Sequence, residues 1–407
     1  MTLMFARQPI LNLNHQLFGY EFLCREEGKG NAYSCDNGDV ATSNVMAASF
    51  LSMGVSELSN QKKAFINFTE TMLLHGVATL FPREQIVVEV LENVEPSMDI
   101  IAACQHLKAE GYTIALDDFV FNLKYEPLIE LADIIKVDFM LTKTDHDRSY
   151  VVKQLQNKRV RFLAEKVESY ADFQSAVKAG YTLFQGYYFS KPVITSSTRI
   201  PPAKVNHLKL INLLESKDPK FEDISRIIEK DVSFSYEILR IANTAYYYRG
   251  QSISSIRQAA IRIGLDELKK WAFITVLRKI GGNGQDTIVN LSAQRAKTLE
   301  LLCRKLSLTG QEMEFFTLGI LSMIDVLAGC PMELLLPELP VSDEVVRVLS
   351  GNYAEGKMSA CYKLVLAYEK GKWDTIFDYA DRYAINVEDV AEAYFKAVVW
   401  TNNVELN

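Results

Sequence analysis

The chain contains 407 residues, of which 48% are hydrophobic and 23% are charged, and its net charge is −7. This composition excludes a disordered chain, and the length provides for two domains. The acidic balance argues against a protein that coats nucleic acid, and no apolar run approaches the ~20 residues of a membrane span.

The cysteines and the N-terminus indicate a cytoplasmic protein. The six cysteines are scattered and form no CxxC pair, which is typical of reduced thiols rather than of a disulfide framework or a zinc site. The first residues show no basic segment followed by a long apolar stretch, so we expect no signal peptide.

The first half alternates short apolar segments with helical ones. The segments that we predict as strands are residues 64–68, 86–90, 112–118, 134–138, 160–165 and 183–187. Most follow one another at intervals of roughly 20–27 residues, the length of one strand and one crossover helix. Several such units in series predict a β/α barrel.

Two further segments, 3–13 and 17–25, precede these strands. The few residues between them cannot form a parallel crossover, so the two segments are predicted to form an antiparallel hairpin. The barrel is therefore not expected to be uniformly parallel.

The second half has helical spacing throughout. A polar, proline-containing segment at 195–202 separates it from the first, so we predict domains at 1–198 and 199–407. Ile224, Ile227, Ile228 and Val232 share one helical face. Ser255 with Gln258 forms a capping box for a helix that Gly264 ends. We predict an all-α bundle here.

Polar residues gather near the predicted strand ends of the first half. They are Glu21, Asn67, Glu89, Glu92, Asp117, Asp118, Lys136, Asp138, Glu165, Glu168 and Gln185. In a β/α barrel these ends meet at one mouth. Oxygen ligands suit Mg²⁺, Mn²⁺ or Ca²⁺, and two such cations suit phosphodiester hydrolysis by a metal-bound water.

A plainer interpretation stays open for single positions. Asp138 and Glu92 would serve equally as caps of the helices that follow. The adjacent acids Asp117 and Asp118, directly after an apolar strand, are hardest to explain by packing.

The motifs resemble those of the EAL domain. Glu21-Phe22-Leu23-Cys24-Arg25 is similar to the ExLxR signature of that family, and Gln8-Pro9-Ile10 to the QPI of its first strand. Asn67 stands where the family has a metal-binding asparagine. The other matching segments are 89–92 (ExxE), 117–119 (DDF), 136–138 (KxD), 165–168 (ExVE) and 185–187 (QGY).

This resemblance, over residues 3–195, implies a modified TIM barrel with an antiparallel first strand that opens cyclic di-GMP to linear pGpG using Mg²⁺ or Mn²⁺. It implies metal ligands at Glu21, Asn67, Glu89 and Asp117, with Asp118 and Glu165 at a second metal. Lys136 would act with the nucleophilic water, Glu168 would support the site together with Gln185, and Gln8 and Arg25 would contact the dinucleotide. Glu92 belongs to the ExxE segment and is assigned a role in loop support.

One departure leaves the activity open. After Asp117-Asp118-Phe119 the family has a loop with two glycines, whereas this chain reads Val120-Phe121-Asn122-Leu123. A non-glycine loop cannot take the same positive-φ turns without strain. Three functions therefore remain: a cyclic di-GMP phosphodiesterase, a sensor that binds the dinucleotide without hydrolysis, and a scaffold that has lost it.

The second half resembles the HDOD domain, a relative of HD phosphohydrolases without their catalytic residues. The matching stretch runs from Asp231 to Gly264, and Asp325 lies where a catalytic relative has its His-Asp pair. The last histidine is His207, so this half lacks a histidine metal site. The resemblance implies an interaction or regulatory module with an unknown protein partner and a possible homodimer. For the run 246–248 of three tyrosines, both a partner surface and the packing of a bundle edge remain open.

Overall fold

The structure is a computed structural model, which describes residues 3–26, 54–119, 122–155, 158–186, 210–211, 214, 221–244, 246–248, 250–282, 284–353 and 356–402. The chain divides into two compact units, one of residues 1–189 with 367–377 and one of residues 190–366 with 378–407. The predicted boundary at 195–202 lies outside the described residues. None of the described helices has the length and apolar content that crossing a bilayer requires.

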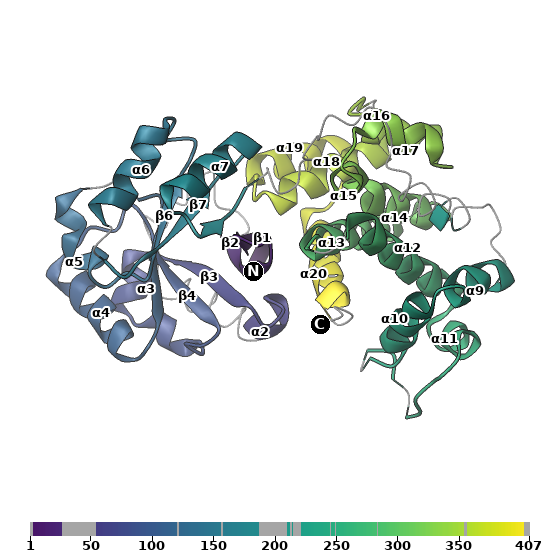
Figure 1. Ribbon diagram of the computed structural model, residues 1–407, viewed down its shortest axis with the longest axis horizontal. Helices are drawn as coiled ribbons and strands as arrows, with labels where there is room; N and C mark the ends of the chain where they lie inside the picture. Colours follow the sequence, from purple (N-terminus) through teal and green to yellow (C-terminus); the bar gives the residue numbers. More distant parts are fainter. Residues whose placement is uncertain are drawn as a thin grey trace. The chain divides into compact units, whose positions relative to one another are not determined.

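The first unit is a closed eight-stranded barrel (Figure 1). Its strands are β1 Leu3–Asn12, β2 Leu17–Glu26, β3 Lys63–Phe68, β4 Ile86–Val90, β5 Thr113–Leu116, β6 Ile134–Asp138, β7 Arg161–Glu165 and β8 Leu183–Phe184. Strand β1 pairs antiparallel with both β2 and β8, and all other neighbours pair parallel. Both the barrel and its antiparallel first strand are thus confirmed.

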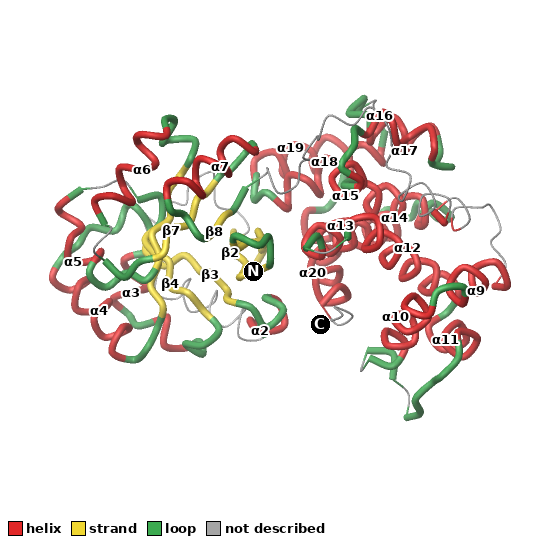
Figure 2. Tube along the Cα trace, viewed as in Figure 1, coloured by secondary structure: helices red, strands yellow, loops and turns green. Residues whose placement is uncertain are grey.

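Helices connect and surround these strands (Figure 2). They are α2 Val55–Leu58, α3 Glu70–Leu74, α4 Met98–Ala109, α5 Glu126–Ile129, α6 Asp145–Gln154 and α7 Tyr170–Ala179, with 3₁₀ turns at Val77–Leu80 and Leu123–Tyr125. Ser97 caps α4 and Thr144 caps α6. The interpretation that Glu92 and Asp138 cap these helices is therefore wrong.

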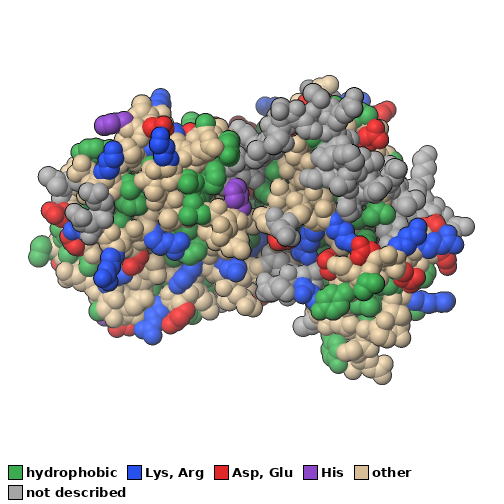
Figure 3. Space-filling view, viewed as in Figure 1, with side chains coloured by type: hydrophobic (Ala, Val, Ile, Leu, Met, Phe, Trp, Pro, Cys, Tyr) green, Lys and Arg blue, Asp and Glu red, His purple; other side chains and the backbone are tan. Residues whose placement is uncertain are grey.

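One face of the barrel unit is of mixed charge. On the face seen in Figure 3, Lys and Arg side chains are scattered among acidic and neutral ones. The coloured residues of this view form no continuous basic stripe.

The second half of the sequence is helical. Its helices are α9 Phe221–Glu229, α10 Val232–Ala242, α11 Ile256–Ile263, α12 Leu265–Gly281, α13 Asp286–Lys305, α14 Glu312–Leu321, α15 Ile324–Ala328, α16 Met332–Leu335, α17 Asp343–Leu349, α18 Lys357–Glu369, α19 Trp373–Tyr383 and α20 Val387–Asn402, with a 3₁₀ turn at Leu336–Glu338. The prediction that Val232 shares the face of Ile224 and Ile228 is wrong. Asp231 caps a new helix there, and Val232 is 85% exposed.

The loop between α10 and α11 is closed by side chains. Asn243 donates through Nδ2 to the carbonyl of Ile253 at 2.9 Å and accepts from its N–H at 2.9 Å. Ser255 caps α11 and Gly264 ends it, as predicted. The Gln258 side chain, however, accepts from the backbone of Ser254 rather than from Ser255, so the capping box is displaced by one residue.

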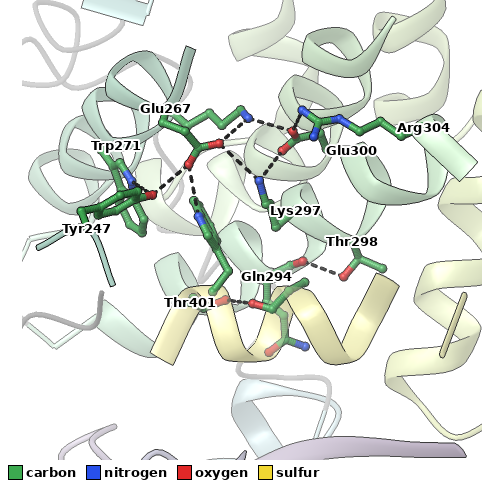
Figure 4. Close-up of polar contacts among 12 residues, drawn as sticks. Tyr247, Glu267, Trp271, Gln294, Lys297, Thr298, Glu300, Arg304 and Thr401 are labelled. Carbon is green, nitrogen blue, oxygen red and sulfur yellow. Dashed lines mark hydrogen bonds and ion pairs between the residues drawn. The ribbon is translucent and has the colours of Figure 1, made fainter. Parts of the chain in front are cut away.

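A buried ring of charges holds α12 and α13 together (Figure 4). Lys270 Nζ lies 2.8 Å from both Glu267 and Glu300, and Lys297 Nζ lies 3.3 Å and 3.0 Å from the same two carboxylates. Tyr247 and Trp400 donate hydrogen bonds to Glu267 at 3.0 and 3.2 Å. Every charge in the ring therefore has opposite neighbours.

Candidate active site

The candidate site is the polar layer directly above an apolar layer in the barrel. The apolar layer contains Ile10, Phe65, Val87, Ala115, Ile134, Leu163 and Leu183, all buried and packed together. Side chains two positions apart along a strand point to the same face. The residues two positions further toward the mouth are Gln8, Asn67, Glu89, Asp117, Lys136, Glu165 and Gln185. The same faces of the strands that form the apolar layer therefore also form a polar layer at the mouth.

Lys136 lies at the centre of this layer and is fully buried. Its Nζ is 2.6 Å from Asp117, 2.8 Å from Glu89, 3.0 Å from Glu165 and 3.2 Å from Glu21. The strand ends thus bring four carboxylates around one ammonium group. Together, the four carboxylates and the ammonium group carry an excess of negative charge.

Burial and crowding shift the protonation of these groups. Burial raises the pKa of Glu89 well above its usual value, and the nearby Glu21 and Asp117 raise it further against the effect of Lys136. Burial acts in the same direction on the pKa of Glu165. For Lys136, burial alone would lower the pKa, but the carboxylates outweigh it and hold the pKa well above the usual value. Lys136 is therefore charged, and another cation would relieve the crowded acids.

Three carboxylates form a second group at the rim. Ligand oxygens of Asp117, Asp118 and Glu165 all lie within 4.8 Å of one another, and this is the one group of three or more potential His, Cys, Asp or Glu ligands found among the described residues. Asp118 has a φ of 40°, a left-handed conformation that is uncommon for a residue with a side chain. Strained backbone of this kind persists mainly at functional sites.

Several buried oxygens of the site fit a metal ion. Within the described part of the chain, Glu89 Oε2, Asp118 Oδ1 and Gln185 Oε1 are buried and accept no hydrogen bond. A buried acceptor that accepts no hydrogen bond is costly, and bound hard cations would satisfy the carboxylate oxygens of Glu89 and Asp118. Asn67 pairs in register with Glu89 on the next strand, which places its amide at the same level.

Two glutamines connect the hairpin to the last strand. Gln185 donates through Nε2 to Glu21 Oε2 at 2.6 Å and to Gln8 Oε1 at 2.9 Å. Gln8 and Glu21 are themselves paired across β1 and β2. Arg25 lies in β2, but its side chain falls outside the described part.

Two candidate residues lie outside the buried layer. The side chains of Glu92 and Glu168, on the loops after β4 and β7, are exposed. Their roles stay predictions. Of the loop after Asp118, residues 120 and 121 are outside the described residues, and Phe119 is anchored by its N–H to the carbonyl of Lys136 at 2.9 Å.

One neighbour of the site was not predicted. Lys166 follows Glu165 directly and pairs with Asp138 at 2.5 Å. The sequence shows that Lys166 follows the acidic strand end at Glu165, but it does not show that Lys166 pairs with Asp138 at the end of another strand.

In the second unit, the acid that the HDOD resemblance singles out, Asp325, has a hydrogen-bond partner within the protein. Burial raises the pKa of Asp325, which accepts a hydrogen bond from the backbone of Val326 at 2.8 Å. Of the three tyrosines at 246–248, Tyr247 packs inward and donates a hydrogen bond to Glu267, whereas Tyr246 and Tyr248 are about half exposed. A partner surface at this run stays a prediction.

Residues 46–192 match the EAL domain family and residues 200–333 match the HDOD domain family. The chain is 35% identical to the protein YuxH of Bacillus subtilis (strain 168) over 99% of both chains. It is 33% identical to the cyclic di-GMP phosphodiesterase CdgJ of Vibrio cholerae over 98% of this chain and 92% of CdgJ.

Solved structures resemble part of the chain. One is a standalone EAL protein from Vibrio cholerae O395 bound to c-di-GMP, with 28% identity and a TM-score of 0.38 over 47% of this chain and 92% of that chain. Another is the Bacillus subtilis YkuI protein in complex with c-di-GMP and calcium, with 19% identity and a TM-score of 0.39 over 64% and 73%.

Proposed function

Because this chain belongs to the family of proteins in which an EAL domain is followed by an HDOD domain, we propose that its barrel binds cyclic di-GMP and hydrolyses it to linear pGpG with divalent cations. A full-length relative named as a cyclic di-GMP phosphodiesterase supports hydrolysis over binding alone. The second half then acts as an interaction and regulatory module for a protein partner.

The observation that carries this proposal is the excess of carboxylates at the barrel mouth. Four of them surround Lys136, and buried oxygens of Glu89 and Asp118 accept no hydrogen bond. Glu21, Asn67, Glu89 and Asp117 would hold one cation, and Asp118 with Glu165 a second. Mg²⁺ and Mn²⁺ suit such oxygen ligands. Bound cations of this kind activate water and neutralise charge on a phosphodiester.

The remaining residues have supporting roles. Lys136 is a charged donor fixed among the acids, so it is suited to positioning the attacking water beside Glu165. Gln185 keeps Glu21 in place through a 2.6 Å hydrogen bond. Gln8 and Arg25, at the hairpin side of the mouth, would contact the dinucleotide, and an arginine is well suited to a phosphate.

A turnover assay tests the proposal. The full-length protein, incubated with cyclic di-GMP and Mn²⁺, is expected to produce pGpG that chromatography detects. Asp117→Asn keeps the shape of the side chain but removes the charge that a cation needs, so turnover should fall at least about 100-fold. Asp99→Asn, an exposed change on α4, is the matched control and should be fully active. Equal turnover in both variants would refute the assignment.

The altered loop after Phe119 keeps a sensor as the second candidate. Such a protein would bind cyclic di-GMP without producing pGpG. Calorimetry with Ca²⁺, a cation that commonly permits binding in this family without supporting hydrolysis, measures the binding step alone. Binding with no turnover in Mn²⁺ would identify the sensor, and the absence of both would leave the scaffold.

A further inference from the structure

Lys166 stands at the rim of the mouth between two acids. Its Nζ is 2.5 Å from Asp138 Oδ2 and 3.9 Å from Asp118 Oδ1. Its side chain is 53% exposed, whereas that of Lys136 is fully buried. The two ammonium groups therefore have different environments, one enclosed by acids and the other open to solvent.

The backbone around Lys166 is fixed on both sides. The Glu165 carbonyl accepts from the N–H of Phe139 at 3.1 Å, and the N–H of Val167 donates to the Gln185 carbonyl at 3.0 Å. Gly186 packs so closely that an added Cβ would lie 2.3 Å from backbone atoms of Val167. Lys166 itself has a φ of 52°, in the left-handed region. Tight packing thus maintains a strained turn that directs this lysine.

Its carboxylate partner is equally well fixed. Asp138 is 5% exposed, and its Oδ1 accepts from the N–H of Met140 at 2.6 Å while its Oδ2 faces Lys166. An ammonium group has three donors. One is taken by Asp138, which leaves Lys166 able to donate to a ligand at the mouth.

The negative charge of the mouth makes an exposed ammonium group useful for binding an anionic ligand. Glu21, Glu89, Asp117, Asp118, Asp138 and Glu165 face two lysines in this region. A cyclic dinucleotide carries a negative charge on each phosphodiester, so acids at the rim repel it. An exposed ammonium beside Asp118 offsets this repulsion where a phosphate would pass.

We propose that Lys166 is a ligand-binding residue that donates to a phosphate oxygen of the dinucleotide, and that Asp138 positions its ammonium group at the rim. This inference rests on the proposed function. The alternative is an ion pair that only stabilises the two loops.

Kinetics and binding of full-length variants separate the two. Lys166→Met keeps the length of the side chain and removes its charge, so KM and the Kd of cyclic di-GMP measured with Ca²⁺ should rise about tenfold, as expected for a lost hydrogen bond to a charged group. The value of kcat should change little, and Lys166→Arg should restore most of the affinity. Lys178→Met, an equal charge change on the exposed end of α7, should leave KM and Kd unchanged.

Two competitors provide a readout that a purely structural role would not move. Inhibition by pGpG should weaken in Lys166→Met, because this product carries phosphates. Inhibition by guanosine, which has the base and sugar but no phosphate, should not weaken. An equal loss for both competitors, or an unchanged KM, would overturn the role of Lys166. A wild-type protein that neither binds nor hydrolyses cyclic di-GMP would instead refute the proposed function, and this inference with it.

Discussion

Lys136 and Glu267 show two ways in which single buried charges are stabilised in this protein. Lys136 has four carboxylates around it, so acids outnumber the ammonium group and a cation is needed. Glu267 has two lysines at 2.8 and 3.3 Å and two hydrogen-bond donors, so its charge is satisfied within the protein. Unbalanced charge indicates a ligand site, whereas balanced charge indicates structure.

The charge of Glu267 should make the second unit sensitive to acid. Burial alone would raise the pKa of Glu267, but Lys297, Lys270 and Tyr247 outweigh it and lower the pKa to about 2 from the usual 4.5. A depressed pKa contributes stability above pH 4.5 that disappears as the pH falls toward 2. At pH 7, Glu267→Gln should therefore lower the free energy of unfolding by about 3 kcal/mol.

Tryptophan fluorescence during urea unfolding measures this effect, because Trp271 and Trp400 stack at 4.4 Å beside Glu267. The difference between wild type and Glu267→Gln should narrow as the pH falls through the window from 4.5 to 2. Glu229→Gln, a change at the exposed end of α9, should have little effect at any of these pH values. A difference that persists undiminished at the lowest pH would contradict a stabilisation by charge.

Among the elements, α13 and α14 pack with unusually close backbones. Gly319 of α14 lies against α13 so closely that an added Cβ would be 2.3 Å from Ala296 Cα and 2.5 Å from its nitrogen. Gly319 begins the stretch 319–325, which the resemblance to the HDOD domain places where a catalytic relative has its His-Asp pair. In this chain, that glycine serves helix packing.

Gly319→Ala should destabilise the second unit. Alanine favours a helix over glycine by about 1 kcal/mol, so an isolated helix would gain stability. Here the new methyl group meets backbone that cannot move aside, and we expect a net loss of about 1–3 kcal/mol in the free energy of unfolding. Gly356→Ala is the control, because its nearest neighbour is a flexible Glu344 side chain at 3.4 Å. A stabilised Gly319→Ala variant would show that the two helices can separate at no cost.

The strands were predictable from the sequence, but the contacts between side chains of different strands were only partly predictable. Alternation along β4 to β7 places Glu89, Asp117, Lys136 and Glu165 at one level, and this follows from residue order alone. The pairing of Lys166 with Asp138 does not, because it depends on a positive φ and on the close packing of Gly186. Turns that close backbone packing imposes leave no periodic signal in the sequence.

At the scale of the whole molecule, the change from β/α to helical periodicity was clear in the sequence. The charge ring of the second unit was not, since Glu267, Lys270, Lys297 and Glu300 have the spacing of solvent-exposed pairs on a helix. Tertiary packing encloses them, since Phe316 of α14 lies against Lys270 and Trp400 of α20 lies against Lys297. Charged residues thus identify a site from sequence when they follow apolar strands, and mislead when they lie on amphipathic helices.

All three tryptophans, Trp271, Trp373 and Trp400, lie in the second half of the sequence, which permits a direct test of regulation between the halves. In a Trp373→Phe background the emission comes from the stacked pair beside Glu267 alone. If the second half senses occupancy of the barrel, adding cyclic di-GMP with Ca²⁺ should change this emission. Asp117→Asn in the same background should abolish the change.

Linkage adds a reciprocal requirement. A coupling free energy acts equally in both directions and is typically about 1–3 kcal/mol. If the charge of Glu267 contributes to this coupling, Glu267→Gln should change the Kd of cyclic di-GMP by a factor of about 5 or more. Calorimetry on both proteins measures this. If the dinucleotide binds while the emission and the Kd both stay constant, the two halves work independently, because a ligand shifts only an equilibrium between states that it binds with different affinity.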